Sequence, residues 1–284
     1  MKFKNYFDNL SKSKPYVIAE IGINHNGDLK IAKDLIVAAK LAGCNAVKFQ
    51  KRSPELCVPR DQWNIIRDTP WGKMTYIDYK KKLEFSFKDY KNLKKIANKN
   101  NIDFVASCWD SESVKFMKLI GVPYYKVASA TITDFDLLKE LKKTRKPIII
   151  STGMSTPKQI DKCVKYLGQN NLCIMHCTSS YPALTTELNL RYIEKLKKKF
   201  KIAVIGYSGH ETNLSSTVAA YVLGAKIIER HITLDRSMWG TDQKSSIEPL
   251  GFARLIRDLN VVDQSLGDGI KKIYKSEIPI MNKL

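Results

Sequence analysis

At 284 residues with 44% hydrophobic side chains, the chain can build one large domain with a sizeable core. No apolar run reaches the roughly 20 residues that a membrane span needs, and the start, MKFKNYFDNLSKSKP, lacks the apolar block of a secretory signal. We therefore expect a cytoplasmic protein that does not act at membranes.

The formal net charge of +20 favours anionic partners, including nucleic acids. However, the lysines are spread along helix-like stretches such as KKLEFSFKDYKNLKKIANKNN, and no nucleic-acid-binding signature occurs. We expect a solvated surface that attracts anionic metabolites and do not expect a nucleic-acid partner. The six cysteines form no CxxC pair and are expected to be reduced and packed as small apolar residues.

Eight short, β-branched runs alternate with helical patterns along the whole chain. These runs are 16–22, 46–50, 103–108, 124–129, 147–152, 171–178, 202–208 and 226–233. Strict alternation of this kind predicts parallel strands, and eight units over about 250 residues predict an α/β fold, a (β/α)8 TIM barrel. An open doubly wound sheet is the alternative, but it usually has a GxGxxG motif after the first strand, where this chain has IGINHNGD.

The pattern divides the chain into three parts. Residues 1–14 form a basic N-terminal arm, residues 15–270 the barrel domain, and residues 271–284 a C-terminal tail. The second strand is followed by a connection, 51–85, that is too long for a plain βα loop and contains two tryptophans. Long loops in compact domains are usually functional or disordered, so we expect a partly ordered lid beside the site.

Two of the four histidines stand at the ends of the last two predicted strands. In the strand alternation, His210 shares a face with Ser208, and His231 shares a face with Glu229. If both faces point to the barrel axis, the two imidazoles are neighbours and can bind one divalent ion with positions left open. The alternative is that they are hydrogen-bonded structural histidines, as we expect for His176.

Two lysines, Lys48 and Lys126, lie within otherwise apolar strands, which is costly unless each meets an anion or a carboxylate. Gln50 shares a face with Lys48, and further polar residues at the strand ends are Ser129, Ser151 and Ser208. This set predicts a pocket for a small phosphorylated acid. The alternative is a pair of structural ion pairs with Glu20 and Glu229.

Five motifs occur in order along the chain: AEIGINHNGDLKIAKDLIVAAKLAGCNAVKFQK, STGM, CTSSYP, GYSGHE and ERHITLD. Together they resemble the sialic acid synthase (N-acetylneuraminate synthase) family from about residue 15 onward. The resemblance implies a transferase of sialic acid biosynthesis that condenses phosphoenolpyruvate with N-acetylmannosamine or a related amino sugar, free or 6-phosphorylated. The products would be phosphate, released by C–O cleavage, and a nine-carbon 2-keto sugar acid.

The resemblance also implies roles for individual residues. His210 and His231 become ligands of Mn²⁺ or Mg²⁺, which would polarise the sugar aldehyde. Lys48 and Lys126 become catalytic contacts to phosphoenolpyruvate. The family binds that substrate and the sugar with further residues, which are here Gln50, Ser129, Ser151, Ser179, Tyr181 and Ser208. Glu20 and Asp242 fall at the reacting groups, where either could act as general base.

The chain departs from the family pattern at three places. Cys108 and Trp109 follow the serine of the third strand, where many members have threonine or glycine. Ala130 and Thr131 replace a sugar-contacting acidic residue, which leaves the acceptor sugar open. The sequence ends at EIPIMNKL, without the antifreeze-like domain that carries an arginine into the partner's site in family dimers.

These departures suggest two sources for the arginine. It would come from a separate antifreeze-like protein, or from the long loop itself, which offers Arg52, Arg60 and Arg67. A homodimer is a candidate assembly on the same grounds. Two other functions stay open: a related condensation with another aldose, of the octulosonate or heptulosonate type, and a non-catalytic, basic binding module.

Overall fold

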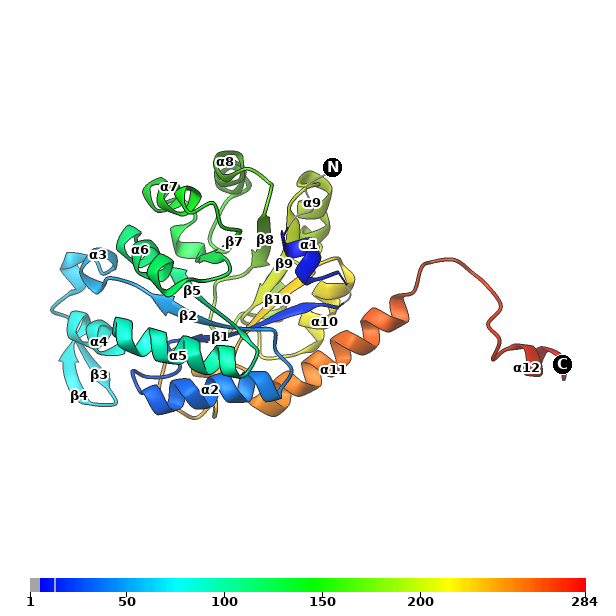
Figure 1. Cartoon of the computed structure of the whole chain (residues 1–284), viewed down its shortest axis with the longest axis horizontal. Helices are drawn as coiled ribbons and strands as arrows, with labels where there is room; N and C mark the ends of the chain where they lie inside the picture. Colours follow the sequence, from blue (N-terminus) through cyan, green and yellow to red (C-terminus); the bar gives the residue numbers. More distant parts are fainter. Residues whose placement is uncertain (1–5, 13) are drawn as a thin grey trace.

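The computed structural model describes residues 6–12 and 14–284. Eight parallel strands close into a barrel in the order β1-β10-β9-β8-β7-β6-β5-β2, and helices surround them (Figure 1). The strands are β1 (Tyr16–Gly22), β2 (Ala46–Lys51), β5 (Asp103–Cys108), β6 (Tyr125–Val127), β7 (Ile148–Ser151), β8 (Leu172–Cys177), β9 (Val204–Gly209) and β10 (Ile227–His231). All eight predicted runs are barrel strands, so the TIM-barrel prediction is confirmed and the open sheet is excluded.

The strand boundaries differ in a way that matters for the site at the fourth run, for which the pattern predicts 124–129. The strand β6 ends at Val127, and Ser129 begins a short 3₁₀ helix, η2 (Ser129–Thr131). The backbone N–H of Thr131 donates to the carbonyl of Ala128 at 3.0 Å, and this turn ends the extended conformation. Ser129 therefore lies in the turn beyond the strand end.

Nine helices of the described chain pack around the barrel or close its ends. They are α1 (Tyr6–Leu10), α2 (Leu29–Leu41), α5 (Phe87–Lys99), α6 (Ser111–Ile120), α7 (Phe135–Lys143), α8 (Pro157–Leu167), α9 (Tyr192–Lys199), α10 (Ser215–Val222) and α11 (Pro249–Leu266). Local sequence defines their starts: Thr156 caps α8 in a capping box, and Asp28 accepts hydrogen bonds from two backbone N–H groups of α2. The strands are buried on both sides because one face lines the barrel interior and helices cover the other.

The connection 51–85 is ordered. It contains α3 (Pro54–Cys57), a 3₁₀ turn, η1 (Arg60–Gln62), an antiparallel hairpin of β3 (Ile66–Thr69) and β4 (Gly72–Thr75), and α4 (Tyr76–Leu83). The ring of Tyr79 packs edge-on against Trp239, with ring centroids 5.5 Å apart. Since Trp239 lies in the loop after β10, the insertion packs against a loop at the carboxyl end of the barrel.

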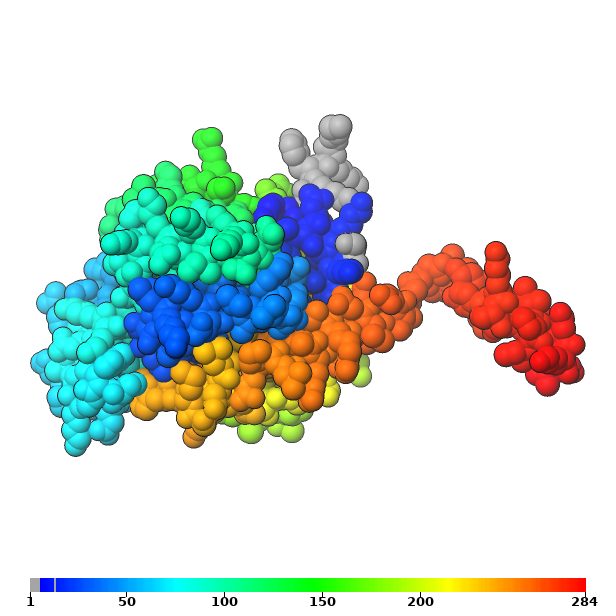
Figure 2. Space-filling model, turned by 60° about the horizontal axis from the view of Figure 1, so that its bottom comes forward, coloured from blue at the N-terminus to red at the C-terminus, as the bar shows by residue number. Residues whose placement is uncertain are grey.

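The two ends of the chain behave differently. Residues 1–5 and 13 of the expected basic arm lie outside the described residues, but α1 within it buries Phe7 in the barrel core. At the other end α11 stops at Leu266, and residues 267–284 run away from the barrel, with a short helix, α12 (Ile278–Met281) (Figures 1 and 2). Within the described part of the chain, no helix is long and apolar enough to cross a membrane.

Candidate active site

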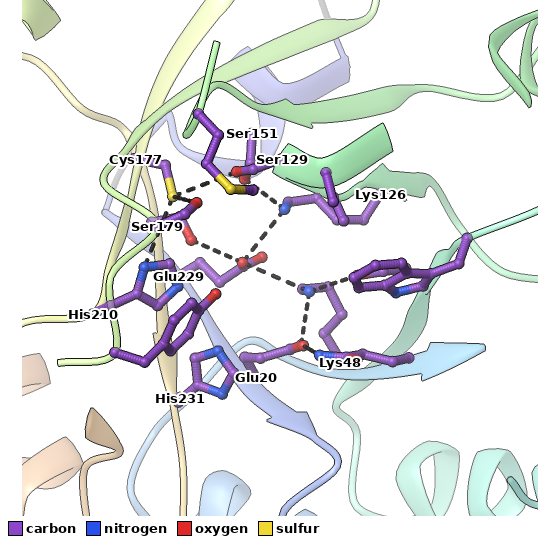
Figure 3. A pocket seen from close by; sticks show the side chains of 18 residues that line it. Glu20, Lys48, Lys126, Ser129, Ser151, Cys177, Ser179, His210, Glu229 and His231 are labelled. Atoms are coloured by element: carbon purple, nitrogen blue, oxygen red, sulfur yellow. Dashed lines mark hydrogen bonds and ion pairs between the residues drawn. The ribbon is translucent and has the colours of Figure 1, made fainter. Parts of the chain in front are cut away.

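A cavity of about 200 Å³ opens at the carboxyl ends of the barrel strands (Figure 3). Side chains from all eight strands or the turns that follow them line it, because parallel strands present their carboxyl ends at one mouth. All predicted site residues except Asp242 lie in its wall: Glu20, Lys48, Gln50, Lys126, Ser129, Ser151, Ser179, Tyr181, Ser208, His210 and His231. The fold therefore brings together predicted site residues that are up to 211 positions apart in the sequence.

Two lysines and two glutamates form the charged floor of the cavity. Lys48 Nζ lies 2.8 Å from Glu20 Oε2 and 3.6 Å from Glu229 Oε1, and Lys126 Nζ lies 3.5 Å from the same Glu229 oxygen. The alternative of buried ion pairs is thus observed together with the predicted pocket. The four charges balance, which makes their burial tolerable and leaves both lysines positioned to exchange a carboxylate for a bound anion.

The two carboxylates differ in proton affinity. Burial raises the pKa of Glu20 to about 7, although Lys48 opposes this effect. Burial also acts to raise the pKa of Glu229, but Lys126 and Lys48 outweigh it and bring that pKa to about 2. Glu229 is therefore ionised at neutral pH, whereas Glu20 can accept and release a proton there.

Serine hydroxyls occupy the side of the cavity near Lys126. Lys126 Nζ donates to Ser151 Oγ at 2.6 Å, and the backbone N–H of Gly153 donates to Ser129 Oγ at 3.1 Å. A Cβ at Gly153 would overlap Ser179 Oγ and lie 2.9 Å from Ser129 Oγ, so only glycine fits between the two serines. Hydroxyls, an N–H group and a cation converge here, which suits a phosphate or carboxylate.

The two histidines lie side by side, as their strand register predicted. Glu229 of β10 pairs with Ser208 of β9, and the ring centroids of His210 and His231 are 5.5 Å apart. Ser208 itself donates to Glu229 Oε1 at 3.1 Å. Tyr181 stacks beside His210, with ring centroids 4.1 Å apart.

The chemistry of this pair fits a divalent metal ion. His210 Nδ1 is 2.7 Å from the carbonyl of Thr178, which leaves Nε2 as an acceptor, and His231 Nδ1 is buried without a hydrogen-bond partner. Burial lowers the pKa of His231 to about 3, so its imidazole is neutral. Asp242 Oδ2 lies 3.9 Å from His231 Nδ1, just outside the cavity wall. No closed cluster of three or more His, Cys, Asp or Glu ligands exists among the described residues, so water and substrate would complete the coordination.

A buried ion pair lies behind the histidines. Arg230 and Glu211, both fully buried, are neighbours in sequence of His231 and His210, and Arg230 Nη1 lies 3.1 Å from Glu211 Oε1. Glu211 also accepts hydrogen bonds from Tyr207 Oη and Thr217 Oγ1, each at 2.9 Å. This cluster fixes the ends of β9 and β10, and sequence reasoning did not identify it because its residues face away from the predicted cavity.

Sequence reasoning also missed several residues of the cavity wall. Glu229 was placed on the face of His231 but was considered only as an ion-pair partner, and the same alternation predicts the inward direction of Cys177, which was missed. The remaining ones are Ser107, Trp109, Ala128, Ala130 and Met154. Of the positions where the chain departs from the family pattern, Trp109 and Ala130 thus line the cavity, whereas Cys108 is buried against α6, with its thiol 3.6 Å from the carbonyl of Ser113.

All six cysteines are free, and five are buried. Cys177 is the exception to the expectation of inert, apolar packing, because its thiol lines the cavity 3.9 Å from His210 Nδ1. Burial raises the pKa of this thiol, but His210 outweighs that effect and brings it to about 7. His176, expected to be structural, hydrogen-bonds through Nε2 to the carbonyl of Leu188 at 2.6 Å.

A closed (β/α)8 barrel with ionisable side chains converging at the carboxyl ends of its strands defines a barrel enzyme. The sequence profile of the NeuB family matches residues 35–271, and the chain belongs to this family. It is 40% identical over 274 residues to the N-acetylneuraminate-9-phosphate synthase of Homo sapiens, covering 95% of this chain and 76% of the human one. The protein is therefore an enzyme of the NeuB type, and the alternative of a non-catalytic module is not supported.

Other comparisons agree on the family. The N,N'-diacetyllegionaminic acid synthase of Campylobacter jejuni is 38% identical, covering 93% of this chain and 81% of that protein. The crystal structure of an N-acetylneuraminic acid synthetase from Leptospira borgpetersenii superimposes with a TM-score of 0.85 at 31% identity, covering 95% and 91% of the two chains. A heptulosonate 7-phosphate synthase from Thermotoga maritima shares the fold, with a TM-score of 0.68 at 12% identity.

Proposed function

We propose that the protein condenses phosphoenolpyruvate with an N-acetylated amino sugar, N-acetylmannosamine or a relative, free or 6-phosphorylated. The products are a sialic-acid-type, nine-carbon 2-keto sugar acid and phosphate. One observation carries the proposal: a single cavity combines an anion-binding side, built from Lys126 and serines, with a side where the Glu20 carboxylate, of pKa about 7, lies near two adjacent histidines. The names of the human and Campylobacter relatives support the choice of substrates.

The anion-binding side suits phosphoenolpyruvate. Lys126, Ser151, Ser129 and Ser179 surround a space that the missing Cβ of Gly153 keeps open. Phosphate and carboxylate oxygens would displace Glu229 as the partner of Lys126 and Lys48, and would accept hydrogen bonds from the hydroxyls. The same cations stabilise the charge on phosphate as it leaves.

The opposite side suits the sugar. His210 and His231 would hold Mn²⁺ or Mg²⁺, and a bound ion of this kind supplies Lewis-acid polarisation of the open-chain aldehyde. Gln50, Tyr181 and Asp242 stand around this position and would bind sugar hydroxyl and acetamido groups.

Glu20, between the anion-binding side and the sugar side, acts as the general base that transfers protons. C3 of phosphoenolpyruvate forms the new carbon–carbon bond with the aldehyde carbon, and the aldehyde oxygen becomes a hydroxyl. Water then adds at C2 and gives up a proton to the Glu20 carboxylate, which passes it on to the former aldehyde oxygen. The C–O bond to phosphate breaks as the new C2 hydroxyl loses its proton to the departing phosphate, and the 2-keto acid remains. The pKa of about 7 lets Glu20 take up this proton and release it again at neutral pH.

Phosphate release with a panel of acceptors tests the proposal. We expect turnover of phosphoenolpyruvate with N-acetylmannosamine or its 6-phosphate, and ¹⁸O from the bridging position of phosphoenolpyruvate should appear in phosphate. Turnover only with arabinose 5-phosphate or erythrose 4-phosphate would identify the related octulosonate or heptulosonate type of condensation. No turnover with any aldose would refute the proposal.

The metal is tested separately. Treatment with a chelator, or His210→Ala, is expected to abolish phosphate release, and His210→Ala should weaken Mn²⁺ binding measured by electron paramagnetic resonance at least tenfold. Unchanged turnover after both treatments would contradict the assignment of His210 and His231 as metal ligands.

A further inference from the structure

Arg52 stands directly after β2 and is held from three sides without lining the cavity. The residue is 8% exposed, and its guanidinium lies over the ring of Trp109, 4.4 Å from the ring centroid. Arg52 Nε is 3.6 Å from Glu84 Oε1. The third contact is a hydrogen bond from Arg52 Nη2 to Gln50 Oε1. A planar guanidinium that is stacked, paired and hydrogen-bonded in this way has little freedom to move.

The hydrogen bond to Gln50 has a consequence inside the cavity. A carboxamide has one accepting end and one donating end, and Arg52 occupies the accepting oxygen of Gln50. The donating end therefore points the other way, and Gln50 Nε2 donates to Glu20 Oε1 at 3.2 Å. If the amide were turned over, its NH2 group would face the guanidinium, donor against donor, and Glu20 would lose this bond.

The close packing around the Gln50 amide also restricts where the amide and the Glu20 carboxylate can lie. A Cβ at Gly22 would lie 3.3 Å from both Gln50 Nε2 and Glu20 Oε1, so the two groups approach across a glycine. On its other oxygen Glu20 meets Lys48 Nζ at 2.8 Å. The Glu20 carboxylate is thus held between a cation and an amide whose direction is set by Arg52.

We propose that Arg52 is a positioning residue that acts on Glu20 through Gln50. It keeps the Gln50 carboxamide in the orientation that donates to Glu20, and so sets the place of the carboxylate beside the acceptor. The positioning follows from the contacts alone, and only its effect on the kinetics rests on the proposed function. Of the three arginines in the 51–85 insertion, Arg52 is the one in contact with cavity-lining residues, whereas Arg60 and Arg67 stack on Trp63 and Tyr76.

The contacts of Arg52 lie on one side of the cavity. Gln50 and Glu20 lie on β2 and β1, whereas Lys126 and Ser151 lie on β6 and β7, and the serine turns follow those strands. Loss of Arg52 is therefore expected to disturb the acceptor and the proton transfer far more than the anion-binding side around Lys126, which Arg52 does not contact. A residue with a merely structural role would weaken both sides together.

Steady-state kinetics of Arg52→Met test this division. We expect kcat to fall and the KM for the acceptor to rise, about tenfold or more in kcat/KM together, while the KM for phosphoenolpyruvate changes less than twofold. Arg52→Lys should recover only part of the lost kcat/KM, because an ammonium group cannot stack on Trp109 and hydrogen-bond to Gln50 as the planar guanidinium does. Arg60→Met, which removes an arginine stacked on Trp63 in the same insertion, is the matched control and should behave as wild type.

A double-mutant cycle tests the route through Gln50. If Arg52 acts through that amide, adding Arg52→Met to Gln50→Met lowers kcat/KM no further. Independent roles would instead multiply the two reductions in kcat/KM. Multiplied losses, or unchanged acceptor kinetics in Arg52→Met, would overturn the proposal.

A measurement without turnover keeps the inference separate from the proposed function. The side-chain NH2 resonances of Gln50, identified by their absence in Gln50→Met, should exchange slowly with solvent in the wild type and fast in Arg52→Met and Arg52→Lys. If no acceptor is turned over, the proposed function fails while this test still decides the role of Arg52. Equal exchange in the wild type and both variants would refute it.

Discussion

Glu20 and Glu229 line the same cavity, but their neighbouring side chains give the two carboxylates different pKa values. Glu229 lies between two lysines, 3.5 and 3.6 Å away, and stays ionised, while Glu20 pairs with a single lysine and titrates near neutrality. Two carboxylates whose environments separate their pKa values are a common basis for acid–base assignments. Here the separation comes from the number of cations that each carboxylate faces.

The pKa of Glu20 predicts the pH dependence of the reaction. As the pH falls below about 7, protonated Glu20 cannot accept a proton, so kcat/KM should fall about tenfold per pH unit. The measurement is phosphate release between pH 5.5 and 8.5, with intrinsic fluorescence to confirm that the protein stays folded. Glu20→Gln should be nearly inactive over the whole range. A profile that is flat below pH 7 would contradict the role of Glu20 as base.

Lys126 should determine affinity for phosphoenolpyruvate. Lys126→Met removes a charge-assisted hydrogen bond and should raise the KM for phosphoenolpyruvate about 10- to 100-fold, with a smaller change for the acceptor. Glu229 keeps Lys48 as a partner in this variant, so the fold should survive. Exposed Lys146 offers the control, and Lys146→Met should leave both KM values unchanged.

At the scale of elements, one carboxylate ties the beginning of the insertion 51–85 to the barrel. Asp110, the N-cap of α6, accepts hydrogen bonds from the backbone N–H groups of Ser113 at 2.8 Å and of Ser53 at 2.7 Å. The same side chain therefore starts a helix and fixes the beginning of the insertion. Lys51 and Arg52 meet Glu84 at the insertion's other end, so the two ends are held together.

Asp110→Ala is expected to destabilise the protein by about 1–2 kcal/mol, the usual cost of a lost cap, and to loosen the insertion. Limited trypsin digestion should then cut faster at Arg60, Arg67 and Lys73. Asp134→Ala removes the cap of α7, where Asp134 accepts hydrogen bonds from two backbone N–H groups, and serves as a matched control. If both variants are cut at equal rates within the insertion, Asp110 has no special part in holding it.

For the molecule as a whole, the buried pair Arg230–Glu211 should matter strongly for stability. Glu211→Ala would leave a fully buried guanidinium without its counter-charge, which typically costs about 3–5 kcal/mol. Urea unfolding measures the loss. The exposed pair Arg257–Asp258 gives the comparison, since Asp258→Ala should leave the free energy of unfolding nearly unchanged. Similar losses in the two variants would contradict this view of the cluster.

The order of the strands and the inward faces of their ends could be predicted from the sequence. β-branched runs separated by helical patterns have few ways to close, and the alternation of side chains in a strand determines which residues share a face. His210 and His231 were found in this way, and Lys48 was found as a lysine within an apolar strand. The motifs then identified the family and implied the role of Glu20.

The sequence alone thus determined the barrel, the family and most of the cavity wall, because these follow from periodicity and local motifs. Only the tertiary structure decided which carboxylate each lysine meets, that Ser129 lies in a turn beyond its strand, and that Arg52 reaches Gln50. These facts depend on distances between side chains from different strands and from an insertion without periodic pattern. Burial, which shifts the pKa values of Glu20 and His231, exists only once those strands have closed.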